Sequence, residues 1–262
     1  MFHRYVALGD SSTEGLDDPD GAGGYRGWAD RLAEQLAGVN PSLLYANLAV
    51  RGRLASQIRA EQLTAALALQ PDVATVFAGV NDLLRPGFDL DRIAADVEHL
   101  QRTLVEAGAR VLSFTMPDLS RVLPLARRLT PRVDGFNARM REVANRSGAL
   151  LVEFGSHQVA GDPRLWAEDR LHANSQGHAR IAAALAYALG LPGSDTSWTQ
   201  PLDRPARLRP HELARAELVW TRRHLAPWVV RRVRGQSSGD GLACKRPALA
   251  PISPRDSIGS AG

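Results

Sequence analysis

Tyr5-Val-Ala-Leu-Gly-Asp-Ser-Ser-Thr-Glu-Gly15 is the stretch from which the fold can be inferred. Its apolar run, Tyr5 to Leu8, has the length of a buried strand, and the glycine and polar residues after it end that strand. Ser11 would then lie at the carboxyl end of a strand in an open α/β sheet, the edge at which such sheets bind ligands. Ser11 is therefore a candidate nucleophile, although a serine here can also simply cap the next helix.

An alternation of short apolar runs and helical patterns continues to about residue 190. Further strands are expected over 43–48, 73–78, 110–115 and 149–154, and helices over 28–37, 54–69, 90–107, 133–147 and 175–189. Strands that are separated by helices pair in parallel through crossover connections. The sequence therefore predicts an α/β fold, a three-layer α/β/α sandwich with a central parallel five-stranded sheet.

The composition is that of a globular protein. The 262 residues, 44% of them hydrophobic, suffice for one substantial domain and an appendage. No apolar run reaches the roughly 18 residues of a membrane span, and no charged-then-apolar leader precedes the first strand. The single cysteine, Cys244, excludes an internal disulfide. We therefore expect a cytoplasmic protein, although a secreted protein without its leader would look the same.

The charge divides the chain into unequal parts. Residues 1–194 hold 20 basic and 22 acidic residues, a net of −2, whereas residues 195–262 hold 12 basic and 6 acidic residues, a net of +6. Turn-forming residues become frequent after Leu191. We expect a main domain over 1–193, a basic linker and helix over 194–234, and a disordered tail over 235–262.

The basic segment has two interpretations. A helix over 211–225, followed by further arginines and Trp228, would pack its leucines and tryptophans on the main domain and leave the arginines in solvent, which is the interpretation we favour. In the alternative, the chain is a binding protein whose C-terminal segment makes weak contact with an anionic membrane surface or nucleic acid. Because the positive charge belongs to the tail, we expect no nucleic-acid binding by the main domain.

A serine nucleophile needs a base, an acid that orients the base, and hydrogen-bond donors for the developing oxyanion. His172 is the candidate base, because it lies in Asp169-Arg-Leu-His172 just before the last helix of the domain. Asp169 could accept the Nδ1 proton and leave Nε2 free for Ser11. By itself, this spacing also fits an ordinary polar loop. We expect His178, six residues further on, to be structural.

Candidate oxyanion donors follow two other strands. Gly52 ends the stretch Asn47-Leu-Ala-Val-Arg-Gly52, and Asn81 lies in Gly79-Val-Asn81-Asp82. A glycine allows a backbone N–H to approach a reacting oxygen closely, and an asparagine amide can donate to developing negative charge. Each stretch is also compatible with a simple turn.

Together, Gly9-Asp10-Ser11, Gly52, Gly79-x-Asn81-Asp82 and Asp169-x-x-His172 resemble the four blocks of the SGNH (GDSL-type) hydrolases, over about residues 4–190. The resemblance implies a flavodoxin-like fold and a serine hydrolase that cleaves acyl esters or thioesters without a metal or cofactor. It implies Ser11 as nucleophile, His172 as base and Asp169 as its orienting acid. The Ser11 N–H, the Gly52 N–H and the Asn81 amide would form the oxyanion hole. Ser12 departs from the leucine often found in this family, which bears on the local pocket.

The resemblance leaves the acceptor and the substrate open. The same residues fit an acyltransferase, in which an alcohol instead of water attacks the acyl-enzyme. The expected partner is a small-molecule acyl ester. We expect the pocket walls to come from the loops over 15–28, 85–88 and 117–125.

Overall fold

The computed structural model describes residues 1–203, 210–227, 230 and 237–252. Its sheet has the strand order β5-β4-β3-β1-β2-β6, in which the first five strands pair in parallel and β6 runs antiparallel to β2. The strands are β1 (Arg4–Gly9), β2 (Leu44–Asn47), β3 (Val73–Phe77), β4 (Arg110–Phe114), β5 (Leu150–Val152) and β6 (Arg246–Pro251).

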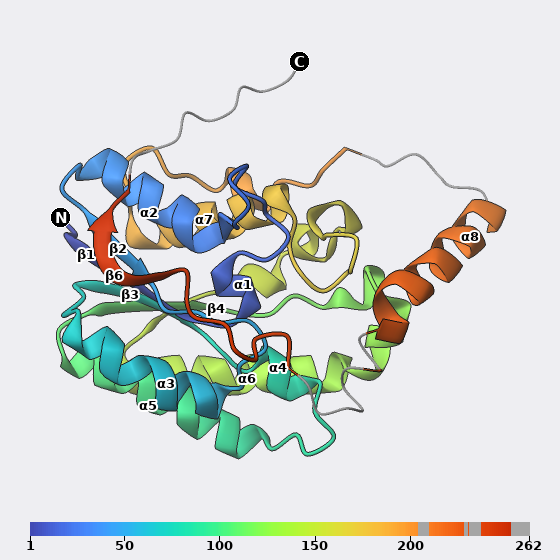
Figure 1. The fold of residues 1–262 in the computed structure, drawn as a ribbon, viewed down its shortest axis with the longest axis horizontal. Helices are drawn as coiled ribbons and strands as arrows, with labels where there is room; N and C mark the ends of the chain where they lie inside the picture. The colour runs from blue at the N-terminus through green and yellow to red at the C-terminus, as the bar shows by residue number, and fades with distance from the viewer. Residues whose placement is uncertain (204–209, 228–229, 231–236, 253–262) are drawn as a thin grey trace.

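Helices cover both faces of the sheet (Figure 1). On one face lie α2 (Gly27–Val39) and α7 (Ser175–Leu189), and on the other lie α3 (Ala55–Ala68), α5 (Leu90–Glu106) and α6 (Thr130–Ser147). Short helices α1 (Ser11–Glu14) and α4 (Val80–Leu83) follow β1 and β3, and α8 (Pro210–Trp220) lies at one end of the molecule. The remaining turns are η1 (Leu119–Arg121), η2 (Pro124–Arg128), η3 (Phe154–Ser156), η4 (Gln158–Gly161), η5 (Pro163–Leu165), η6 (Ser197–Thr199) and the π-helical η7 (Thr221–Leu225). The predicted three-layer α/β/α class is confirmed.

Strand β1 lies within the sheet between β2 and β3, and its residues from Tyr5 to Leu8 are fully buried. Because helices cover both faces, side chains on both sides of the strand are apolar. The Tyr5 hydroxyl and the Thr75 hydroxyl are 2.9 Å apart, and the Tyr5 ring stacks on Tyr45. Burial of each large apolar side chain stabilises the fold by about 1.5–3 kcal/mol. The strand that leads to Ser11 is therefore held rigidly.

The sheet has one strand more than predicted. β6 comes from the segment expected to be disordered, so the prediction of disorder over 235–262 is wrong for 237–252, and residues 253–262 lie outside the described residues. Pro247 and Pro251 make this strand hard to predict from the sequence. Proline has no N–H to donate to a neighbouring strand, so its presence argues against a central strand. At the edge of a sheet, where one side of the strand faces away from its neighbour, proline is tolerated.

Part of the predicted linker also packs on the main domain. The Trp198 ring is buried and stacks on Phe154 with ring centroids 6.0 Å apart. The Arg180 guanidinium on α7 donates to the carbonyl oxygens of Trp198 and Gln200, at 2.7 and 2.8 Å. Residues 194–203 are therefore tied to the α7 face, whereas 204–209 lie outside the described residues.

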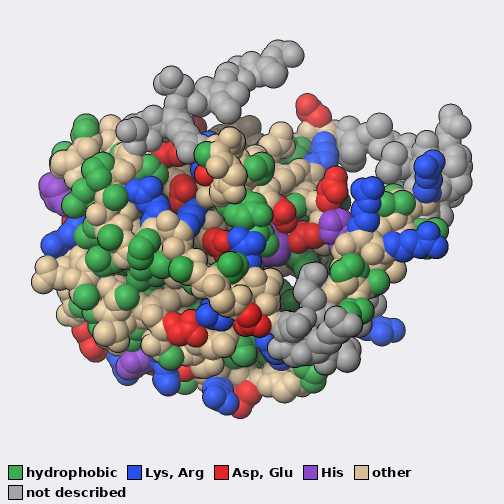
Figure 2. Space-filling model, in the orientation of Figure 1, with side chains coloured by type: hydrophobic (Ala, Val, Ile, Leu, Met, Phe, Trp, Pro, Cys, Tyr) green, Lys and Arg blue, Asp and Glu red, His purple; other side chains and the backbone are tan. Residues whose placement is uncertain are grey.

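Helix α8 buries Trp220 but leaves Leu218 54% exposed, so only part of the predicted packing is observed. Arg222 and Arg223 are exposed, and basic side chains stand out at this end of the molecule (Figure 2). The further predicted residues Trp228, Arg231, Arg232 and Arg234 lie outside the described residues. Contact of this segment with an anionic surface stays a prediction. Within the described ranges, no helix is both long and apolar enough to span a membrane.

Candidate active site

Ser11 lies at the sharp turn where β1 ends and α1 begins. The side chain of Gln62 holds this turn, because its amide donates to the Gly9 carbonyl and its oxygen accepts the Gly9 N–H, both at 2.9 Å. Asp10 caps α1 by accepting the Ser12 N–H at 3.1 Å. These bonds fix the backbone on both sides of Ser11, and its hydroxyl faces the carboxyl edge of the sheet.

The structure brings Ser11, His172 and Asp169 into one chain of hydrogen bonds. His172 Nε2 lies 2.8 Å from the Ser11 hydroxyl, across 161 positions of sequence, and Nδ1 lies 2.6 Å from a carboxylate oxygen of Asp169. The other Asp169 oxygen accepts the backbone N–H groups of Leu171 and His172, each at 3.0 Å. Asn174 caps α7 directly after this loop. The loop therefore presents imidazole and carboxylate in fixed mutual orientation.

The charges around His172 favour its protonated form. Burial alone would lower the pKa of His172, but the hydrogen bond and charge of Asp169, with the charges of Asp17 and Asp10, outweigh burial and raise it. Burial likewise acts to raise the pKa of Asp169, and the His172 contact overcomes this and lowers it. The carboxylate thus stays charged, accepts from Nδ1, and leaves Nε2 in a position that would allow it to accept a proton from Ser11.

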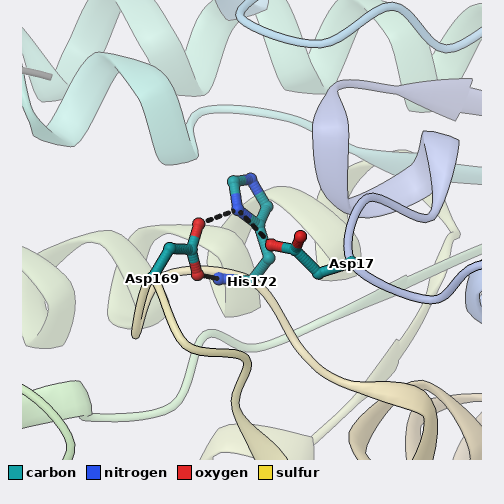
Figure 3. Close-up of side chains that lie close together, drawn as sticks. All are labelled: Asp17, Asp169 and His172. Atoms are coloured by element: carbon teal, nitrogen blue, oxygen red, sulfur yellow. Dashed lines mark hydrogen bonds and ion pairs between the residues drawn. The ribbon is translucent and has the colours of Figure 1, made fainter. Parts of the chain in front are cut away.

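Asp17 is a second carboxylate beside the same imidazole, and it lies in the loop over 15–28, which the sequence predicted only as a pocket wall. Its oxygen lies 3.5 Å from His172 Nδ1 (Figure 3). Its backbone is left-handed, with a φ of 66°, which is uncommon for a residue other than glycine. Asp17, Asp169 and His172 offer ligand atoms within 4.8 Å of one another, the spacing of a small metal site. The 2.6 Å contact between His172 and Asp169 is that of a hydrogen bond.

The predicted oxyanion donors come from other parts of the chain than the loop that carries Asp169 and His172. Gly52, with a φ of 75°, and Asn81 both line the cavity in front of the serine. The Asn81 amide donates to Asp10 at 2.9 Å and to the Arg53 carbonyl at 3.1 Å. In the described part of the chain, the backbone N–H groups of Ser11 and Gly52 have no protein acceptor. Among the described residues, the first two predicted donors are therefore unpaired, whereas both hydrogens of the Asn81 amide are already engaged.

Asp10 is a buried acid at the centre of this arrangement. Burial raises the pKa of its carboxyl to about 7, although the Ser12 N–H, the His172 charge and the Asn81 amide all act to lower it. His172 is the predicted base, and Asn81 is a predicted oxyanion donor. Asp10 therefore interacts with a residue from each predicted group.

Ser11 opens into a cavity of about 320 Å³, within the usual range for small-molecule sites. All three predicted walls contribute: Leu16 from the first, Arg85 from the second, and Pro117, Asp118, Leu119 and Leu123 from the third. The walls are mainly apolar, with side chains from Val80, Leu83, Phe114, Met116, Leu119, Leu123, Ala126, Leu129 and Val133. Two further lining residues, Ser237 and Ser238, were not predicted, because they come from the segment expected to be disordered.

His178 takes no part in the cavity. It is fully buried, its Nδ1 accepts the Trp28 N–H at 3.1 Å, and its Nε2 lies 3.1 Å from the Leu16 carbonyl oxygen. Burial lowers its pKa to about 4, so the ring is neutral near pH 7. His178 is structural, as predicted, and ties α7 to α2.

A serine, an imidazole and a carboxylate in sequence at the carboxyl edge of a parallel sheet have the geometry of a serine hydrolase site. Residues 7–180 match the GDSL-like lipase/acylhydrolase family, and the chain belongs to this family. The predicted family is thus confirmed, and the protein is a hydrolase enzyme.

Solved structures share the fold at low sequence identity. LAE5, an alpha/beta hydrolase enzyme from the metagenome of Lake Arreo, Spain, is 23% identical with a TM-score of 0.62, and the alignment covers 73% of this chain and 97% of LAE5. TesA is 22% identical, with a TM-score of 0.57 and coverage of 71% and 98%. A catalytic mutant of Axe2, an acetylxylan esterase from Geobacillus stearothermophilus, is 19% identical, with a TM-score of 0.60 and coverage of 77% and 97%. No curated protein matches the sequence.

Proposed function

We propose that the protein hydrolyses carboxylic esters or thioesters through an acyl-enzyme on Ser11. The observation that carries the proposal is the chain of two hydrogen bonds, 2.8 Å from Ser11 to His172 and 2.6 Å from His172 to Asp169, at the mouth of an apolar cavity. This order of donors and acceptors lets one imidazole accept a proton from the serine and return it to a leaving group.

In the proposed reaction, the Ser11 oxygen attacks the substrate carbonyl carbon while His172 Nε2 takes the hydroxyl proton. The oxyanion of the tetrahedral intermediate accepts the free N–H groups of Ser11 and Gly52. Asn81 joins them by exchanging one of its two protein acceptors for the oxyanion. His172 then gives its proton to the departing alkoxide or thiolate. Water, deprotonated by His172, attacks the acyl-enzyme and releases the acid and Ser11.

The apolar cavity supports an acyl chain as the group that the enzyme selects. Each methylene that leaves water contributes about 0.8 kcal/mol, or roughly a fourfold gain in kcat/KM. On p-nitrophenyl esters we expect kcat/KM to rise from acetate through the medium chain lengths, until the cavity of about 320 Å³ is filled. Best turnover of the acetate ester would show that the cavity does not take the acyl chain.

Covalent labelling tests the nucleophile directly. An alkyl fluorophosphonate should add one phosphonyl group to the wild-type chain in intact-mass spectra and none to Ser11→Ala, which should also lose ester turnover. The neighbouring Ser12→Ala is the matched control and should still be labelled. Labelling of Ser11→Ala would exclude Ser11 as the nucleophile. Product analysis with added alcohols separates hydrolysis from acyl transfer, since a transferase yields a new ester.

A further inference from the structure

The part of the chain that follows the family match touches both loops that flank Ser11. The match ends at residue 180. We use the name C-terminal extension for the described residues 210–227 and 237–252. Residues 237–252 lie against the loop that carries Gly52, and residues 210–227 lie against the loop that carries Asp169 and His172.

Residues 237–252 of the extension are anchored firmly to the main domain. β6 pairs with β2 from Leu44 to Asn47. Just before β6, the Lys245 ammonium donates to the carbonyl oxygens of Tyr25 and Arg26 and forms an ion pair with Asp30, each at 2.9 Å. Four-fifths of the lysine side chain is buried. A buried ammonium with three oxygen partners fixes the chain at this point.

Upstream of this anchor, the turn over 237–239 packs directly on the Gly52 loop. A side chain at Gly239 would place its Cβ 1.9 Å from the Arg51 carbonyl oxygen, so only glycine allows this approach. A Cβ at Gly52 would in turn lie 2.3 Å from the Ser237 hydroxyl, which donates weakly to the Gly52 carbonyl at 3.4 Å. Asp240 closes the turn by accepting the Ser237 N–H at 2.8 Å.

The Gly52 loop is held from its other side by α1. The Glu14 carboxylate accepts the Arg51 N–H at 2.9 Å and pairs with the Arg51 guanidinium. The loop is thus clamped between the helix that begins with Ser11 and the turn over 237–239. Because the free Gly52 N–H belongs to this loop, both contacts set where that donor lies.

Residues 210–227 of the extension hold the loop that carries Asp169 and His172. Arg170, between Asp169 and His172, has a left-handed φ of 63°. Its guanidinium forms an ion pair with Glu217 at 2.8 Å and lies over the Trp220 ring, 4.7 Å from the centroid. An unfavourable backbone conformation persists only where its surroundings enforce it. The N–H groups of Leu171 and His172, which donate to Asp169, hold the backbone around Arg170, and Glu217 and Trp220 hold the Arg170 guanidinium from α8.

We propose that the C-terminal extension positions both catalytic loops: the turn over 237–239 sets the Gly52 donor, and α8 holds Arg170 and with it the Asp169–His172 pair. The inference rests on the proposed function of these loops. Ser237, Glu217 and Trp220 are positioning residues, since they act through Gly52 and Arg170.

Gly239→Ala tests the turn. The φ of Gly239 lies outside the left-handed region, so alanine acts through its contacts with the Gly52 loop, at Arg51 and Val50. Displacement of an oxyanion donor weakens only the transition state, so we expect kcat to fall roughly 10–100-fold with KM within twofold of wild type. Asp240→Ala, which loosens the turn from outside, should lower kcat roughly 3–10-fold. Gly38→Ala is the matched control, because a Cβ there meets nothing within 4 Å.

Trp220→Ala tests α8. Without the ring, the Arg170 loop should relax and weaken the hydrogen bond that raises the pKa of His172. We expect kcat/KM to fall roughly tenfold and its acid limb to move to lower pH. Trp220→Phe keeps an aromatic face for the guanidinium and should restore most of the activity. Leu218→Ala, on the exposed side of the same helix, is the control and should behave as wild type.

Hydrogen exchange provides a readout that does not depend on turnover. Peptides over 47–55 should exchange faster in Gly239→Ala, and peptides over 167–174 faster in Trp220→Ala, with neither change in the controls. Unchanged exchange in both loops, or wild-type kcat in both variants, would overturn the inference. Absence of ester turnover and of Ser11 labelling in the wild type would instead reject the proposed function, and the exchange data would still decide the role of the extension.

Discussion

On the proposed acid–base side of the site, His172 and Asp169 are already hydrogen-bonded to each other and to Ser11. On the proposed oxyanion side, Asn81 donates both amide hydrogens to protein acceptors, and among the described residues only backbone N–H groups are unpaired there. In the proposed reaction, the acid–base side is thus assembled before substrate arrives, whereas Asn81 must exchange a partner to reach the oxyanion. Because the two sides depend on different contacts, each can be disturbed separately.

The largest expected effect of a change on one side alone comes from Asp169→Asn. The amide is neutral and cannot stabilise a protonated imidazole as the carboxylate does. It can also donate an N–H to Nδ1, which would place the proton of His172 on Nε2, so that Nε2 could not accept the Ser11 proton. We expect kcat to fall by roughly 10³–10⁴-fold. Steady-state kinetics on an activated ester measure this loss. Near-wild-type turnover would remove Asp169 from the proposed triad and point to Asp17 as the effective acid.

Asn81→Ala disturbs the oxyanion side. If Asn81 turns from the Arg53 carbonyl to the oxyanion, its loss should cost roughly 10²–10³-fold in kcat, with little change in KM. An unchanged kcat would mean that the amide only positions Asp10. The smaller effect expected here than for Asp169 reflects the two backbone donors that remain.

Asp10→Asn tests how the buried Asp10 carboxyl, which accepts from Asn81, affects the free energy of unfolding. Burial raises the pKa of Asp10 to about 7 in the folded protein, whereas an exposed aspartate titrates near pH 4, so the folded state binds more protons than the unfolded state between these values. The free energy of unfolding of the wild type should therefore fall as pH rises through this window, by up to roughly 1.4 kcal/mol for each pH unit.

The amide of the Asp10→Asn variant does not titrate, so the variant should gain stability relative to wild type as pH rises from about 4 to about 7. Urea unfolding of both proteins at several pH values across this window measures the difference in the free energy of unfolding. A difference that stays constant with pH would contradict a raised pKa for Asp10.

The smallest expected effect is that of Asp17→Asn. The Asp17 charge helps to raise the pKa of His172, and the neutral form of His172 is the proposed base. Loss of that charge should lower this pKa and move the acid limb of kcat/KM to lower pH, with less than a roughly tenfold change at the plateau. A shift to higher pH would contradict the assigned sign.

Local signals in the sequence were enough to predict the fold class, and the strand ends and the loop on which the candidate site residues lie. The apolar run from Tyr5 to Leu8, followed by Gly9-Asp10-Ser11, marks a buried strand and a sharp turn, and both are found. The loop from Asp169 to His172 precedes α7 as expected. These features depend on residues that are close together in the chain, and such patterns are what a sequence displays.

Contacts between distant segments could not be predicted. The bond of Asn81 with Asp10 and the packing of Gly239 on Arg51 join positions 71 and more residues apart, and no periodicity reports them. β6 was hidden by its prolines, which indicate a loop unless the edge of the sheet is known. The contact of Asp17 with His172 could not be predicted, because it depends on a left-handed backbone conformation at Asp17 that no sequence pattern indicates.

The prolines of β6 have a consequence for how copies of this protein meet. β6 covers the edge of β2, and its own sequence carries Pro247 and Pro251, which offer no N–H to a neighbouring strand. An open strand edge is a template for aggregation, and edge prolines are one way in which natural sheets prevent it. A chain cut at residue 194 would expose the edge of β2, and we expect such a chain to associate strand to strand more readily than the full chain does.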